Sequence, residues 1–156
     1  MSYTLGLYEK SMPSGLTWRE MLTAGREAGF DRLEISIDET DARLSRLDWS
    51  EKEKAELRTL QSEIGMPIRT MCLSGHRKYP LGSRDARVRT QGMEIMRKAV
   101  NFAGEMGIRI IQLAGYDVYY EEDGDDTRAC FAENLAKGVE YAASQGIMLG
   151  FETMET

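Results

Sequence analysis

The chain repeats one pattern of apolar and polar positions four times. Each repeat has apolar residues spaced as on one face of a helix, then a glycine, then a short apolar run typical of a buried strand. A glycine suits the position just after a helix, where the backbone turns left-handed. With an opening strand at residues 4–8, the predicted order is βαβαβαβαβ. The glycines and the strands after them are Gly29 with 30–37, Gly65 with 66–73, Gly107 with 108–113, and Gly146 with 147–151.

Two of the predicted helices begin with a capping box. Thr17 is followed three residues later by Glu20, and Ser50 by Glu53. In each pair the two side chains can satisfy backbone N–H groups that the start of a helix leaves free. Apolar residues at helical spacing continue behind these caps and recur in the two later helices. They include Trp18, Met21 and Leu22; Leu57, Leu60 and Ile64; Met93, Met96 and Val100; and Phe131, Leu135 and Val139.

Strands separated by helices are parallel, which leaves a closed barrel or an open doubly wound sheet. The chain has no G-x-G-x-x-G after a strand, the signature of a dinucleotide fold. Polar residues instead gather where the predicted strands end, and a barrel carries its chemistry at that rim. We therefore expect an α/β fold, a (β/α)8 barrel, present here as an incomplete barrel of about five parallel strands and four helices. The polar rim residues include Glu9, Lys10, Asp38, His76, Gln112 and Glu152.

A closed barrel of this type takes about 250 residues, whereas this chain has 156. We expect residues 1–156 to form a single domain that is the N-terminal part of a longer barrel. Because 42% of the residues are hydrophobic and 29% are charged, the composition is that of a soluble globular domain. No apolar run reaches the ~18 residues of a membrane span.

The formal net charge of −6 repels phosphate backbones, so we expect no nucleic-acid partner. Because no apolar run is long enough to span a bilayer, we also expect no membrane partner. The two cysteines, Cys72 and Cys130, have neither metal-ligand spacing nor the density of a disulfide scaffold. We expect both to be reduced core thiols of a cytoplasmic protein.

Glu152 and His76 are the first candidates for chemistry. Glu152 ends an apolar strand, where a partly desolvated carboxylate could bind a divalent metal or act as a base. From position alone, a rim glutamate paired with an arginine or capping the next helix is the favoured alternative. His76, the only histidine, could bind a sugar hydroxyl or transfer a proton, and a loop histidine bonded to the backbone is an equal alternative.

The charged loops leave further alternatives open. Arg77, Lys78 and Arg84 could meet a phosphate group, but solvated loop charge is favoured. Residues 38–50 mix acids, arginines and apolar residues, and could form a loop over the pocket or pack between elements. The acidic run 121–126 lacks the ligand spacing of a calcium loop, so we interpret it as a solvated loop with Asp125 or Asp126 capping the next helix.

Three segments carry a family resemblance: residues 37–49, 71–77 and 108–120, which read IDETDARLSRLDW, MCLSGHR and IRIIQLAGYDVYY. Together they closely resemble the L-ribulose-5-phosphate 3-epimerases, also called L-xylulose-5-phosphate 3-epimerases, of ascorbate and related pentose catabolism. These enzymes belong to the xylose isomerase-like TIM barrel superfamily, and the likeness spans essentially the whole chain.

The resemblance implies an isomerase that epimerises C3 of a ketopentose 5-phosphate, helped by a divalent metal ion (Zn, Mn or Mg). It matches Glu152 to a glutamate that is both metal ligand and acid or base, which overturns the interpretation from position alone. It also makes His76, Glu9, Lys10 and Gln112 candidate contacts to the sugar phosphate. The other metal ligands of the family come from later strands, so we expect this chain alone to be inactive.

A different class of function remains open. A half barrel could be a non-catalytic module that self-associates through its strand edges or binds a sugar phosphate, and in either case we expect a homo-oligomer. A metal-dependent endonuclease of the related superfamily fits poorly with the negative charge and the single histidine.

Overall fold

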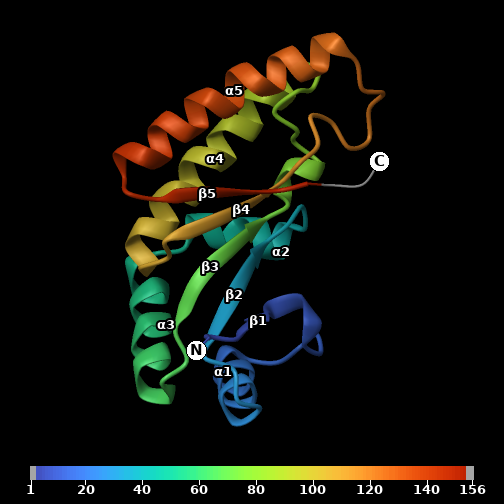
Figure 1. Cartoon of the computed structure of the whole chain (residues 1–156). Coiled ribbons are helices and arrows are strands. Elements are labelled where there is room, and N and C mark those ends of the chain that lie inside the picture. Colours follow the sequence, from blue (N-terminus) through green and yellow to red (C-terminus); the bar gives the residue numbers. More distant parts are fainter. Residues whose placement is uncertain (1–2, 154–156) are drawn as a thin grey trace.

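The computed structural model describes residues 3–153 and contains one sheet of five parallel strands (Figure 1). The strand order follows the sequence, without a reversal. This confirms the predicted parallel sheet and excludes a doubly wound arrangement of these strands. The strands are β1 (Gly6–Tyr8), β2 (Arg32–Ile37), β3 (Ile68–Leu73), β4 (Ile110–Ala114) and β5 (Met148–Glu152).

Within residues 3–153, five α-helices connect the strands, one more than predicted. The additional helix, α2, has only four residues, too few for a helical period to show in the sequence. The helices are α1 (Trp18–Glu27), α2 (Asp41–Leu44), α3 (Glu51–Ile64), α4 (Ala86–Met106) and α5 (Asp125–Ser144). Short 3₁₀ turns lie at η1 (Glu9–Ser11), η2 (Ser45–Asp48) and η3 (Gly75–Arg77).

The predicted helix starts at Thr17 and Ser50 and the predicted helix ends at Gly65 and Gly107 are confirmed. Capping boxes form at Thr17 and at Ser50, each closed by the glutamate three residues on. Gly65 and Gly107 end α3 and α4 with φ of 71° and 73°, the left-handed conformation that favours glycine. At α5 the N-cap residue is Gly124 rather than an aspartate, and Asp125 and Asp126 lie in the first turn, where negative charge suits the helix dipole.

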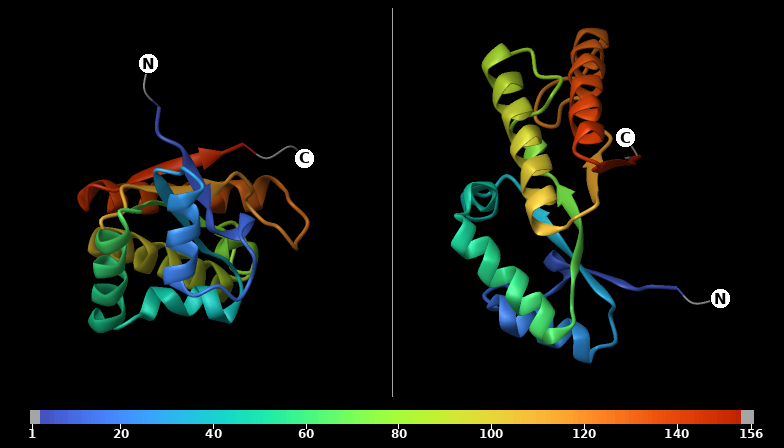
Figure 2. Two further views of the ribbon diagram at one scale, coloured as in Figure 1. Left: turned by 90° about the horizontal axis from the view of Figure 1, so that it is seen from below. Right: turned by 90° about the vertical axis from the view of Figure 1, so that its left-hand side faces the viewer.

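The helices cover one face of the curved sheet (Figure 2). Alternate strand residues point toward them, because side chains alternate along a strand. On β2 these residues are Leu33, Ile35 and Ile37, each 0% exposed. They pack with outward residues of the other strands and with the apolar faces of the helices to form one core. Outward partners on the other strands include Met71, Leu73, Ile111 and Leu113.

The concave face of the sheet carries the opposite set of side chains. Strand pairing places Ser36 beside Cys72, and Cys72 beside Gln112. Ile110 and Met148 on the same face are 37% and 64% exposed. The concave face is therefore partly polar and open to solvent in the part of the chain described. Both cysteines are free. No helix within residues 3–153 is long and apolar enough to cross a membrane.

Candidate active site

A pocket of about 330 Å³ lies on the concave face, near the carboxyl ends of the strands. Strands β1 to β5 or the turns that follow them all contribute to its wall. This is the position at which barrels of parallel strands carry their chemistry. Its lining residues are Tyr8, Lys10, Glu34, Cys72, Leu73, Ser74, Arg77, Gln112, Ala114 and Glu152.

Glu152 is the last residue of β5, and its carboxylate faces the pocket. Gln112 on β4 donates a hydrogen bond from Nε2 to Glu152 Oε2 at 2.6 Å. Glu152 is exposed among the described residues, which corrects the expectation of a partly desolvated carboxylate. The reason is structural: among residues 3–153, β5 is an edge strand that pairs only with β4. Sequence position thus predicted the place of both side chains but not the solvation of Glu152.

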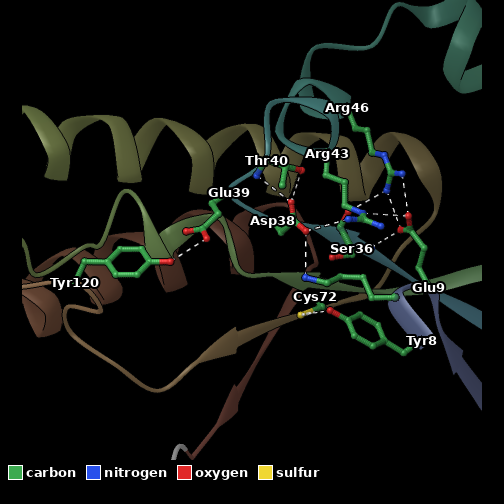
Figure 3. A network of polar contacts seen from close by, with 11 residues as sticks. Tyr8, Glu9, Ser36, Asp38, Glu39, Thr40, Arg43, Arg46, Cys72 and Tyr120 are labelled. Carbon is green, nitrogen blue, oxygen red and sulfur yellow. Dashed lines mark hydrogen bonds and ion pairs between the residues drawn. The ribbon is translucent and has the colours of Figure 1, made fainter. Parts of the chain in front are cut away.

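Glu9 follows β1 at the same rim but does not line the pocket. Its side chain is 2% exposed and is taken up by other residues. Arg46 donates to both carboxylate oxygens at 2.8 Å, Arg43 Nε donates to Oε1 at 3.3 Å, and the Ser36 backbone N–H donates to Oε2 at 2.8 Å (Figure 3). These contacts satisfy the Glu9 carboxylate, and the one from Ser36 links turn η1 to β2.

Lys10, the next residue, does reach the pocket. Its Nζ donates to Asp38 Oδ2 at 3.1 Å, and the lysine side chain is 32% exposed. Burial opposes ionisation of Asp38, but hydrogen bonds from Thr40 and Lys10 outweigh it and lower the pKa of that carboxyl to about 2. The pair is therefore a charged one at neutral pH, with the ammonium on the pocket side.

Of the two alternatives left open for residues 38–50, the structure supports packing between elements, since none of these residues lines the pocket. Arg43 and Arg46 reach the rim carboxylates, whereas Leu44, Leu47 and Trp49 pack against the core. Helix α2 and turn η2 therefore attach the rim network to the body of the fold.

His76 lies in η3 after β3, at the predicted end of the barrel, but it is only 7% exposed and does not line the pocket. Its Nε2 lies 3.1 Å from the carbonyl oxygen of Gly92 in α4. A carbonyl only accepts, so Nε2 carries the proton. Burial lowers the pKa of His76 to about 4, against a smaller opposing effect of this hydrogen bond. The geometry is that of a neutral structural histidine bonded to backbone.

Arg77, in contrast, lines the pocket and is half-buried rather than solvated. Its guanidinium carbon lies 5.0 Å from the centre of the Tyr119 ring, a cation–π contact. The neighbouring Ser74 Oγ is buried and has no hydrogen-bond partner among residues 3–153. Arg84 lies elsewhere, where it forms two 2.8 Å hydrogen bonds to Asp126.

The sequence interpretation did not single out Glu34 and wrongly placed Cys72 in the core, but both side chains line the pocket. Glu34 and Cys72 stand inside apolar strands, at positions whose neighbours in sequence face the core. The alternation of strand side chains could have found them, because both share the inward parity of Gln112. Tyr8 Oη donates to Cys72 Sγ at 3.7 Å. Burial raises the pKa of Tyr8 to about 12 and also raises that of Cys72, so both groups are protonated at neutral pH.

The described residues do not complete a metal site. Nowhere in residues 3–153 do three or more His, Cys, Asp or Glu side chains come together as metal ligands. A protein metal centre needs about three or more such ligands. Glu152 could supply one ligand at the rim, and any others lie outside this part of the chain.

Comparison with known proteins identifies the class. The xylose isomerase-like TIM barrel family matches residues 22–156, and the chain belongs to that family. It is 52% identical over 151 residues to the L-ribulose-5-phosphate 3-epimerase UlaE of Salmonella heidelberg (strain SL476), covering 97% of this chain and 53% of that protein. UlaE of Salmonella enteritidis PT4 (strain P125109) is 50% identical over 151 residues, again covering 97% of this chain and 53% of that protein. The chain thus spans about half the length of the curated relatives it matches.

Solved structures confirm the barrel fold. A D-psicose 3-epimerase crystallised in the presence of D-fructose superposes with a TM-score of 0.77 at 19% identity, covering 94% of this chain and 51% of that one. A structure of L-ribulose 3-epimerase gives a TM-score of 0.67 at 23% identity, covering 94% and 48%. At these identities the likeness concerns the fold, a partial α/β barrel of five parallel strands.

Proposed function

We propose that the protein, at its natural length, epimerises C3 of L-ribulose 5-phosphate or L-xylulose 5-phosphate. The observation that carries the proposal is the pocket itself, which combines the carboxylates Glu34 and Glu152 with the cations Lys10 and Arg77. Glu152 at the strand end and the two cations suit a substrate with an acidic C–H at one end and a phosphate at the other. The relatives named L-ribulose-5-phosphate 3-epimerase support the same substrate.

Glu152 is the group proposed to move the proton. The hydrogen on C3 is acidic because the adjacent C2 carbonyl can take up the electron pair as an enediolate. Glu152 takes this proton on one face of the sugar, and an acid from outside residues 3–153 returns a proton to the other face, which inverts C3. The hydrogen bond from Gln112 occupies Oε2 of Glu152 and leaves Oε1 for the proton.

The phosphate end of the substrate is assigned to Lys10, Arg77 and Ser74. The two cations can donate charge-assisted hydrogen bonds to phosphate oxygens. Ser74 Oγ, which is buried and without a partner among the described residues, offers a neutral donor in the same pocket. Glu9 and His76 are proposed to support these contacts from behind, because neither lines the pocket.

We also propose a divalent metal ion, Zn, Mn or Mg, with Glu152 as one of its ligands. When bound, such an ion stabilises negative charge on the substrate oxygens. Because the described residues do not complete its site, residues 3–153 alone are expected to be inactive.

The test is turnover of L-ribulose 5-phosphate by the protein at its natural length, followed by NMR, with unphosphorylated L-ribulose as the comparison. Loss of the phosphate should lower kcat/KM by about 100-fold or more, since two charge-assisted contacts are lost. Arg77→Met should raise KM roughly 10-fold or more, whereas Lys78→Met, at the exposed neighbouring position, should not. Equal turnover of the two sugars would contradict the proposal.

We infer that the chain also self-associates, because the edge strand β5 exposes apolar side chains. Met148 and Phe151 are 64% and 51% exposed, and a parallel sheet with an open edge invites pairing. Residues 1–156 should then form a homo-oligomer, and without turnover they would be a half-barrel module that binds the sugar phosphate. Light scattering at micromolar concentration tests this, and a monomer would contradict it.

We place the protein in the cytoplasm, in pentose or ascorbate catabolism. Two free cysteines are typical of a reducing compartment. Fractionation of cells that express the protein at its natural level tests this location, and recovery outside the cytoplasm would contradict it.

A further inference from the structure

The rim network around Glu9 and Asp38 has an excess of positive charge. Lys10, Arg43 and Arg46 carry three positive charges, against two negative charges on Glu9 and Asp38. The two carboxylates are buried, with side chains 2% and 8% exposed. Among these five side chains only Lys10 lines the pocket. The excess charge is therefore presented to the pocket by its ammonium group.

Asp38 is immobilised independently of Lys10. Its Oδ1 accepts hydrogen bonds from the Thr40 backbone N–H at 3.0 Å and from Thr40 Oγ1 at 2.6 Å (Figure 3). Its Oδ2 accepts from Lys10 Nζ and from Arg43 Nη1, each at 3.1 Å. Lysine is a flexible side chain that loses much freedom when it is fixed. A carboxylate already held by Thr40 and Arg43 can fix the ammonium before a ligand arrives.

Arg43 links this carboxylate to the fold. The same guanidinium donates from Nη1 to Asp38 and from Nε to Glu9 Oε1, the latter at 3.3 Å. Glu9 in turn is bonded to the Ser36 backbone N–H at 2.8 Å. The position of Lys10 thus depends on a chain of contacts that ends on β2.

We propose that Asp38 is a positioning residue that aims Lys10 at the anionic end of the ligand, with Arg43 as the bridge that holds Asp38. Asp38 itself does not line the pocket, so it acts through Lys10 and not on the ligand. This role rests on the proposed function, because the contact between Lys10 and a phosphate group is part of that function. It adds that affinity for the phosphate is set by two residues behind the pocket wall.

The test is a double-mutant cycle on the protein at its natural length, with inorganic phosphate as the binding probe and L-ribulose 5-phosphate as the substrate. Lys10→Met should raise the phosphate Kd and the KM roughly 10- to 100-fold, as expected for a lost charge-assisted contact. Asp38→Asn should raise both roughly 3- to 10-fold with kcat nearly unchanged. The Kd and KM of the double variant should match those of Lys10→Met alone, because Asp38 affects phosphate binding only through Lys10.

Asp41→Asn is the matched control, since Asp41 is exposed on α2 and makes no ion pair within residues 3–153. It should change neither constant. ¹⁵N NMR of the lysine ammonium groups adds a readout that needs no turnover. A signal from the immobilised Lys10 ammonium should be visible in the wild type and absent in Asp38→Asn. If Asp38→Asn does not fold, Arg43→Met carries the test, with the same direction of change in Kd.

The possible results separate the two claims. Phosphate binding that follows the predicted cycle, without epimerisation of L-ribulose 5-phosphate, would refute the proposed function and keep the positioning role. An Asp38→Asn variant with unchanged Kd, or one whose effect simply adds to that of Lys10→Met, would overturn the positioning role. Kd unchanged in Lys10→Met would overturn it as well.

Discussion

The buried histidine makes the stability of the fold depend on pH in a defined window. His76 is 7% exposed, and its pKa in the folded chain is lowered to about 4 from 6.5. Between these values an unfolded chain takes up a proton on this side chain while the folded chain does not. Stability is therefore complete above about pH 6.5 and falls as the pH is lowered toward 4. This direction is the one expected for a histidine that is buried in its neutral form.

The size of the effect follows from the pKa difference. A difference of one pKa unit corresponds to about 1.4 kcal/mol, so the fall from 6.5 to about 4 amounts to about 3 kcal/mol. Natural domains are stable by only about 5–15 kcal/mol. The free energy lost when this one side chain is protonated in the unfolded state is therefore a large fraction of the total free energy of unfolding.

The assay is urea unfolding of the wild type and of His76→Gln between pH 4.5 and 7.5. Glutamine can still donate to the Gly92 carbonyl but does not titrate, so the variant should lack the pH dependence that His76 causes. As the pH is lowered from 7.5 to 4.5, the free energy of unfolding of the wild type should fall by about 2–3 kcal/mol relative to that of the variant. Parallel pH profiles, or an NMR titration that gives His76 a pKa near 6.5, would refute the reasoning.

Two further predictions concern packing and access to the pocket. A Cβ at Gly92 would lie 2.5 Å from the Tyr79 carbonyl oxygen, whereas one at Gly104 in the same helix would meet nothing within 4 Å. In urea unfolding, Gly92→Ala should cost about 1–3 kcal/mol and Gly104→Ala should gain about 0.5–1 kcal/mol; equal effects would contradict this packing. Burial raises the pKa of Cys72, so its alkylation near pH 7, followed by mass spectrometry, should be slow. L-ribulose 5-phosphate should slow it further at Cys72 but not at Cys130, and protection of neither cysteine would show that the ligand binds elsewhere.

The fold could be predicted because its signals are local and repeated. Gly65 and Gly107 end helices, and Thr17 and Ser50 begin them, through contacts that reach only a few residues along the chain. Such local contacts can be predicted from short sequence patterns. Helix α2 escaped prediction because a single turn contains no period.

Which of the candidate residues line the pocket could be predicted where backbone position decides the outcome, and could not be predicted where distant partners decide it. Lys10, Gln112 and Glu152 line the pocket because strand ends converge at one rim. Glu9 shares that rim, but its carboxylate is bound by Arg43 and Arg46, which lie 34 and 37 residues further along the chain. No local pattern specifies such a pairing, so the direction in which the Glu9 side chain points emerges only from the tertiary structure.

The central claim is that Glu152 moves the proton at C3. The most direct test is hydrogen exchange at C3 of L-ribulose 5-phosphate in heavy water, measured by NMR on the protein at its natural length. Glu152→Gln keeps the size of the side chain but removes its basicity, and exchange should fall about 100- to 10,000-fold. Glu140→Gln, at an exposed position on α5, should exchange like the wild type. Exchange at the wild-type rate in Glu152→Gln would show that this carboxylate does not carry the chemistry.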